Sequence, residues 1–153
     1  MEIKVESKNK NYAEILKNNY CGINSDLNMF LLYKYQYCLF NYGDNYLSSN
    51  INKFAGDSLT HFEILGRLIS MLGDKPNYEN LLINDFYYVT DKEQAIEVDI
   101  RLTKEKIISY TNSLNSIKDD YIKEILTSFI IEERKNLEIL EILQLKYKRE
   151  KLY

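Results

Sequence analysis

The sequence predicts an all-α protein built as a four-helix bundle. Long segments rich in Leu, Ile, Lys and Glu run without helix breakers. The 153 residues include only five Gly and one Pro, which leaves little material for the turns of a β-sandwich. Apolar residues recur at alternating steps of four and three positions, which is the spacing of helices that face a bundle core. We therefore exclude an all-β fold.

Helix breakers divide the first half of the chain into two predicted helices. The first covers about residues 11–42 and ends at Gly43, a residue type that often follows a helix. The second covers about residues 45–72 and ends at Gly73, and Pro76 prevents it from resuming. Because only a few residues connect these helices, we expect them to pair as an antiparallel hairpin.

The second half predicts another hairpin, which a long crossover joins to the first. Thr90 followed three residues later by Glu93 is a capping-box pattern and predicts a third helix over about residues 91–115. A fourth helix is expected over about residues 120–148, with acidic residues at its start and basic residues at its end. The crossover of about 17 residues, mainly residues 74–89, is long enough to let the second and third helices run parallel.

Length and charge restrict the organisation and the partners. The chain is long enough for a single domain, expected over residues 11–153 after a flexible N-terminal segment, residues 1–10. The net charge of −3 makes nucleic acid an unexpected partner. No apolar run approaches the length of a transmembrane helix, so a cytoplasmic protein is expected. Cys21 and Cys38 fall on one predicted helix, about 25 Å apart, too far for a disulfide.

Polar residues interrupt the apolar seams of all four predicted helices near their middle. Burying a polar group without a partner costs about 1–3 kcal/mol, so six such interruptions favour a site, or the remnant of one, over chance. We expect them to meet in one buried layer. The six residues are Asp26, Ser58, His61, Thr103, Glu133 and Asn136.

The spacing of these residues matches the skeleton of a dinuclear metal centre. Di-iron and di-manganese carboxylate bundles place one Glu on each of two helices and a Glu-x-x-His motif on each of the other two. Ser58 with His61, and Glu133 with Asn136, have this separation of three residues. Only part of the ligand chemistry is present.

Four segments resemble the ferritin-like bundle proteins of the rubrerythrin and manganese-catalase type, which are common in anaerobic spore-forming bacteria. The segments are SDLNMFLLYKY, HFEILGRLISMLGDKPNY, VDIRLTKEKIISY and DDYIKEILTSFIIEERKNLEIL. The resemblance implies a ferritin-like bundle in which Asp26, His61 and Glu133 keep ligand character. It also implies that Ser58, Thr103 and Asn136 replace two Glu ligands and one His ligand, so a complete dinuclear centre is not expected.

Two functions are predicted from these residues. The first is a non-catalytic structural or interaction protein without a cofactor, acting as a homodimer or with a protein partner. The alternative is a protein that binds one Fe, Mn or Zn ion through Asp26, His61 and Glu133, or a weak oxidoreductase for peroxide or oxygen. Association with spores is a further expectation from the resemblance.

Overall fold

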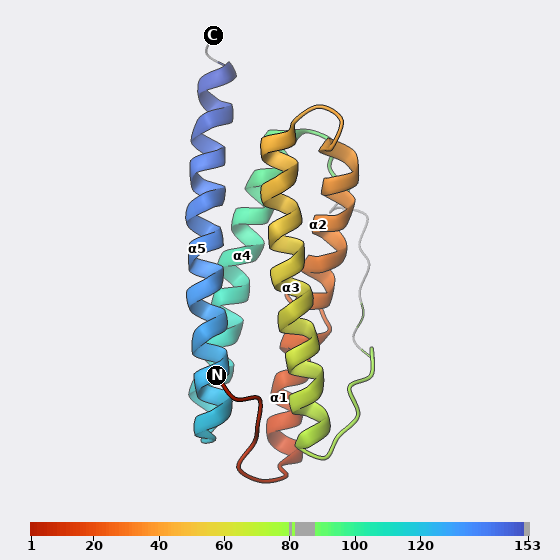
Figure 1. Ribbon diagram of the computed structural model, residues 1–153, viewed down its shortest axis with the longest axis vertical. Helices are drawn as coiled ribbons and strands as arrows, with labels where there is room; N and C mark the ends of the chain where they lie inside the picture. Colours follow the sequence, from red (N-terminus) through yellow and green to blue (C-terminus); the bar gives the residue numbers. More distant parts are fainter. Residues whose placement is uncertain (80, 82–87, 152–153) are drawn as a thin grey trace.

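The computed structural model describes residues 1–79, 81 and 88–151, and these residues form five helices and no strand. The helices are α1 (Lys10–Tyr20), α2 (Asp26–Phe40), α3 (Asn45–Met71), α4 (Lys92–Ser116) and α5 (Asp120–Lys151). Four of them, α2 to α5, lie side by side in an elongated bundle, and α5 extends beyond the others at one end (Figure 1). The predicted all-α class is confirmed. None of the helices in the described part combines the length and apolar character needed to span a bilayer.

The helices pair as the connection lengths predict. The antiparallel partner of α3 is α2, with α1 continuing the line of α2, and α4 pairs with α5 (Figure 1). As a result α3 and α4 run in the same direction. The crossover predicted over residues 74–89 lies between them, and its residues 80 and 82–87 fall outside the described residues.

The prediction of one continuous helix over residues 11–42 is wrong, because the chain breaks between α1 and α2. Gly22 adopts φ +149°, a backbone conformation that favours glycine. The hydroxyl oxygen of Ser25 accepts a hydrogen bond from the amide of Asn28 at 3.2 Å and caps the start of α2. Asp26 therefore becomes the first residue of α2, with its side chain fully buried.

The break also changes the argument about the two cysteines. Cys21 lies just after α1, whereas Cys38 lies near the end of α2. The two do not form a disulfide with each other, so that prediction is confirmed although its premise, a shared helix, is wrong.

Acidic side chains start the three longer helices. Asp44 caps α3 and Asp119 caps α5, each by accepting a hydrogen bond from a backbone amide three residues later, at 2.9 and 3.1 Å. Asp91 caps α4 in the same way at 3.0 Å, so the prediction of Thr90 as the capping residue is wrong by one position. The amide of Glu6 donates to Asp119 at 2.8 Å, which links the N-terminal segment to α5. The flexibility of residues 1–10 stays a prediction.

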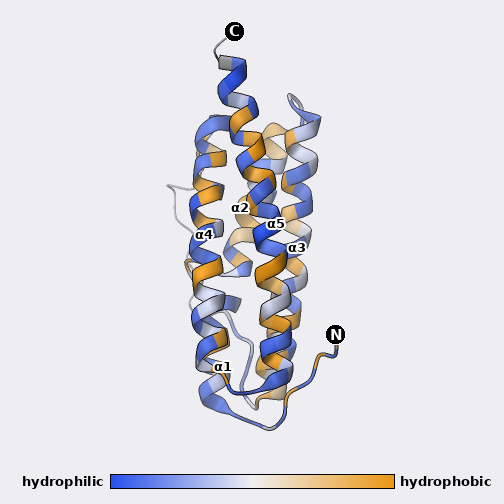
Figure 2. Cartoon of the chain, turned by 90° about the vertical axis from the view of Figure 1, so that its left-hand side faces the viewer, coloured by the Kyte–Doolittle hydropathy of each residue, from blue (hydrophilic) through white to orange (hydrophobic). Residues whose placement is uncertain are grey.

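Two hydrophobic clusters fill the bundle, one above the other. Hydrophobic and hydrophilic residues alternate along α4 and α5 (Figure 2), and hydrophobic residues of both helices belong to the core clusters. One cluster includes Leu47, Ile51, Phe54, Leu140 and Leu143. The other includes Leu65, Leu68, Leu72, Ile122 and Leu126. On α3, α4 and α5, buried polar residues separate the members of one cluster from those of the other.

Candidate metal centre

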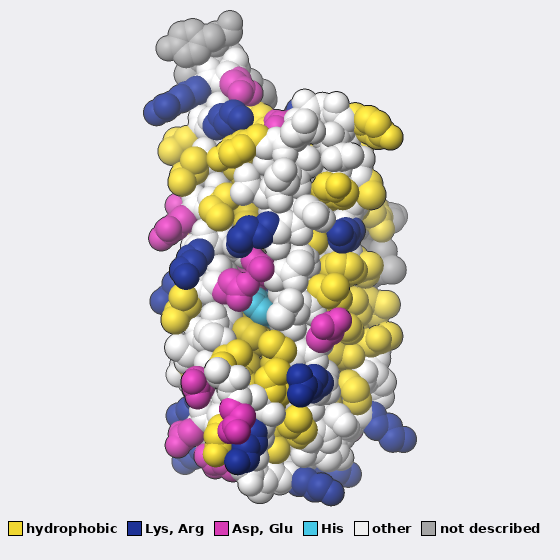
Figure 3. Space-filling view, viewed as in Figure 1, with side chains coloured by type: hydrophobic (Ala, Val, Ile, Leu, Met, Phe, Trp, Pro, Cys, Tyr) yellow, Lys and Arg dark blue, Asp and Glu magenta, His cyan; other side chains and the backbone are white. Residues whose placement is uncertain are grey.

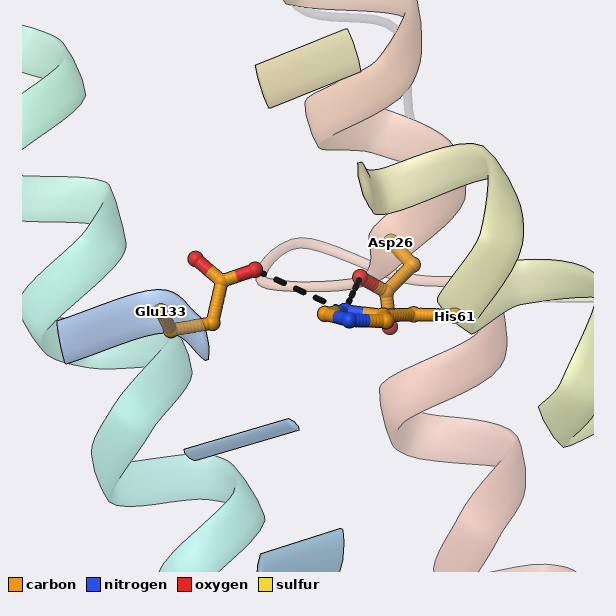
Figure 4. Close-up of side chains that lie close together, drawn as sticks. All are labelled: Asp26, His61 and Glu133. Carbon is orange, nitrogen blue, oxygen red and sulfur yellow. Dashed lines mark ion pairs between the residues drawn. The ribbon is translucent and has the colours of Figure 1, made fainter. Parts of the chain in front are cut away.

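All six polar residues predicted to face inward are buried, each with at most 2% of its surface exposed. The structure brings three of them into direct proximity (Figure 4). The Nδ1 atom of His61 lies 3.5 Å from Oδ1 of Asp26 and 3.6 Å from Oε1 of Glu133. One potential ligand atom from each residue lies within 4.8 Å of the others. This triad, Asp26, His61 and Glu133, is a potential metal-binding group.

Each member of the triad comes from a different helix. Asp26 begins α2, His61 lies in α3 and Glu133 lies in α5. The imidazole ring of His61 stacks on the ring of Phe129, with centroids 4.0 Å apart and planes at 22°. Because Phe129 is itself buried, this contact restricts the orientation of the imidazole.

A lysine that the sequence argument did not select lies in the same cluster. The Nζ atom of Lys106, from α4, lies 2.5 Å from Oδ1 of Asp26 and 2.8 Å from Oε1 of Glu133. The ammonium also donates to Oγ of Ser58 at 3.2 Å. Only 1% of Lys106 is exposed. A fourth helix therefore contributes a cation, not a carboxylate, to the centre.

Glu132 and Tyr110 complete the surroundings of His61. Oε2 of Glu132 lies 3.0 Å from Nε2 of His61, so this carboxylate contacts the buried imidazole. Glu132 is partly exposed and forms the outer edge of the cluster. The hydroxyl of Tyr110 donates to Oδ2 of Asp26 and lies 3.5 Å from Nδ1 of His61. Contacts through His61 and Asp26 therefore connect the partly exposed carboxylate of Glu132 with the buried phenol of Tyr110.

Oppositely charged groups in the cluster stabilise one another in their charged forms. Burial alone would raise the pKa of Asp26, but the Lys106 ammonium and His61 hold it below its usual value. Burial opposes protonation of His61, yet hydrogen bonds to Asp26 and Glu132 raise its pKa to about 9. Burial likewise opposes the charge on Lys106, but Asp26 and Glu133 raise its pKa above the ordinary value. At neutral pH, two cations therefore face the buried carboxylates.

Thr103 and Asn136 form different hydrogen bonds. The hydroxyl groups of Thr103 and Tyr33 lie 3.5 Å apart. The side-chain amide of Asn136 donates to Asp57 and accepts from Lys53, each at 3.0 Å. Among the described residues, neither side chain belongs to the potential metal-binding group.

The position of Lys106 in the sequence already places it on an inward face of α4. Lys106 lies three residues after Thr103 and four before Tyr110, so it belongs to the same helix face as both. However, Lys is rarely buried without a partner, so the sequence of α4 alone does not predict a core position for Lys106. The missing information was the pair of carboxylates on α2 and α5, which the sequence of α4 does not contain.

Comparison with known proteins identifies the architecture. No protein-family model matches the sequence, and no curated protein matches it. The solved structure of a manganese catalase from Anabaena PCC7120 superposes with a TM-score of 0.85 at 14% identity, over 97% of this chain and 77% of that one. Bacterioferritin from Rhodobacter capsulatus, described with a metal-free dinuclear site, superposes with a TM-score of 0.82 at 18% identity, over 94% and 89%.

A bacterioferritin from Desulfovibrio desulfuricans, whose structure contains a diiron site, superposes with a TM-score of 0.78 at 20% identity. The match covers 91% of this chain and 81% of that chain. The resemblance seen in the sequence is confirmed at the level of the fold. This chain has the ferritin-like four-helix-bundle fold of manganese catalases and bacterioferritins.

Proposed function

We propose that this chain is a structural or interaction protein in which a ferritin-like bundle has lost its dinuclear metal centre. The observation that carries the proposal is the ammonium of Lys106, which lies between the carboxylates of Asp26 and Glu133. In this arrangement the buried negative charge is balanced by the chain itself. A bundle of this kind acts through its surface.

The residues present do not fit two metal ions. Dinuclear carboxylate bundles use four carboxylates and two imidazoles. The described residues bring together two carboxylates and one imidazole, with the partly exposed carboxylate of Glu132 on the outer side of that imidazole. Ser58, whose hydroxyl accepts from Lys106, offers only a neutral oxygen. Thr103 and Asn136 are engaged elsewhere. Nothing in this donor set replaces the missing carboxylates and the second imidazole.

Metal analysis combined with activity assays tests this proposal. The full chain is purified without chelator from cells supplied with Fe or Mn, and the metal content is measured by plasma mass spectrometry. We expect much less than one transition-metal ion per chain and no catalase or ferroxidase turnover above a heat-denatured control. Two metal ions per chain together with turnover would contradict the proposal.

A second candidate is a protein that binds a single metal ion. It is favoured by the ligand atoms of Asp26, His61 and Glu133, which lie within 4.8 Å of one another. Two carboxylates and an imidazole suit Fe, Mn or Zn. We place this candidate second because Lys106 already contacts the same two carboxylates.

The outer face of α2 supports a role in self-association. Along its 15 residues, α2 contains only two charged residues, buried Asp26 and exposed Lys34. Leu31, Leu39 and Cys38 are exposed on this helix. Hydrophobic side chains gather on the side of the molecule that α2 forms (Figure 3). A helix that is apolar on its outer as well as its inner face is typical of one covered by a partner, and we propose a homodimer.

Light scattering after size-exclusion chromatography tests the homodimer. We expect a mass of twice the chain for the wild type, and a mass of one chain for the double substitution Leu31→Glu and Leu39→Glu. The double substitution Ile142→Glu and Leu145→Glu, at exposed positions on α5, is the matched control and should leave the mass unchanged. A monomeric wild type at micromolar concentration would contradict this part of the proposal. A cytoplasmic location and association with spores stay predictions.

A further inference from the structure

The ammonium of Lys106 contacts both buried carboxylates of the central cluster. Its Nζ atom lies 2.5 Å from Asp26 Oδ1, 2.8 Å from Glu133 Oε1 and 3.2 Å from Ser58 Oγ. The two short distances to the carboxylates are those of strong, charge-assisted contacts. Lys106 is therefore a positive charge held at a fixed position by three residues from three other helices.

The two oxygen atoms that contact this ammonium are those that face the imidazole. Asp26 Oδ1 and Glu133 Oε1 lie 3.5 and 3.6 Å from Nδ1 of His61. A divalent ion bound by the triad would sit about 2.0–2.2 Å from these atoms. Such an ion would bind the same two oxygens that the Lys106 ammonium contacts, at 2.5 and 2.8 Å. The ammonium and a metal ion would therefore compete for these oxygens and repel each other.

We propose that Lys106 is a tethered cation that closes a mononuclear divalent-metal site formed by Asp26, His61 and Glu133. Removal of its side chain opens that site to one transition-metal ion. The inference rests on the proposed loss of the dinuclear centre and names the group that closes what remains of it.

Covalent attachment makes Lys106 an effective competitor. A group attached to the same fold acts at a high effective concentration, so a dissolved metal ion must displace a cation that never diffuses away. The ammonium also has little room to withdraw, because only 1% of the residue is exposed and Ser58 Oγ accepts a hydrogen bond from it. Displacing it would leave a charged group in the core without its partners, which is strongly unfavourable.

Titration with Co²⁺ tests this inference on the full chain after removal of metals with a chelator. Co²⁺ bound by carboxylates and imidazole absorbs visible light, and Zn²⁺ can then be used to displace it. We compare the wild type with Lys106→Ala and Lys106→Gln, and use Lys104→Ala, an exposed lysine on the same helix, as the matched control. Circular dichroism establishes that each variant is helical.

We expect at least one Lys106 variant to bind one equivalent of Co²⁺ at least 100-fold more tightly than the wild type and Lys104→Ala. Adding His61→Ala to that variant should weaken its Co²⁺ binding at least tenfold. Binding of one Co²⁺ by the wild type as tightly as by the variants would overturn the inference, as would folded variants that bind no metal. One bound ion without turnover in the wild type overturns only this inference, whereas two ions with turnover overturn the proposed function.

Discussion

We expect the substitution Asp99→Asn to remove a fall in stability that the wild-type chain shows as pH rises. Asp99 on α4 and Gln36 on α2 are both fully buried, and Gln36 Nε2 donates to Asp99 Oδ1 at 2.7 Å. Among the described residues, Asp99 Oδ2 and Gln36 Oε1 have no hydrogen-bond partner. A proton on Asp99 Oδ2 provides the donor that an acid–amide pair with Gln36 needs.

Burial raises the pKa of Asp99 to about 8, although the hydrogen bond from Gln36 works in the opposite direction. In the unfolded chain an aspartate titrates near its ordinary value of about 3.9. Between these two values the folded state holds a proton that the unfolded state has lost. The contribution of Asp99 is therefore fully present below about pH 4 and is lost as pH rises through about 8. Between these two pKa values, Asp99 should change the free energy of unfolding by about −1.4 kcal/mol per pH unit.

Urea unfolding at several pH values between 5 and 7 measures this effect. Relative to Asp99→Asn, the free energy of unfolding of the wild type should decrease by about 3 kcal/mol over these two pH units. The introduced amide keeps the hydrogen bond from Gln36 and does not titrate. Glu97→Gln, at an exposed position on α4, should instead follow the wild type. Parallel pH profiles for the wild type and Asp99→Asn would refute the reasoning.

Three further substitutions test the packing of the centre and the break between α1 and α2. Lys106→Met in the presence of chelator should lower the free energy of urea unfolding by about 3–5 kcal/mol, because two buried carboxylates lose their cation. Exposed Lys104→Met should change it by less than about 0.5 kcal/mol, and equal effects would refute the role of the ammonium. Phe129→Ala removes the ring stacked on the imidazole and should lower the same free energy by about 3–5 kcal/mol; a loss below about 1 kcal/mol would show that this contact is dispensable. Gly22→Ala should lower the melting temperature because of the positive φ at this position. Gly56→Ala within α3, where an added Cβ meets no neighbour, should raise it. Shifts of the same sign would contradict the assignment of a break at Gly22.

The fold was largely predictable because its signals are local. Apolar periodicity, acidic capping residues and the lengths of the connections all lie within short stretches of sequence, and together they favour one topology. The break between α1 and α2 was missed although Gly22 and Ser25 are both visible in the sequence. One glycine inside an apolar pattern is tolerated by many helices, so only the observed φ and the hydroxyl cap distinguish a break from a continuous helix.

The candidate site was predictable where a polar residue interrupts an apolar seam. Asp26, His61 and Glu133 were found in this way, because each stands at a position that periodicity assigns to the core. Glu132 and Lys106 were not found in this way, although Lys106 shares a helix face with Thr103, since charged residues are expected on the surface unless a partner is known. Their partners are on other helices and become neighbours only when the chain folds.

The sequence by itself therefore determined the helical class, the pairing of the helices and the height at which polar groups enter the core. These properties follow from the period of the helix and from residues close together in the chain. Only the tertiary structure decided that the centre contains an ammonium between two carboxylates. Charge pairing depends on distances between atoms of different helices, and those distances are set by packing.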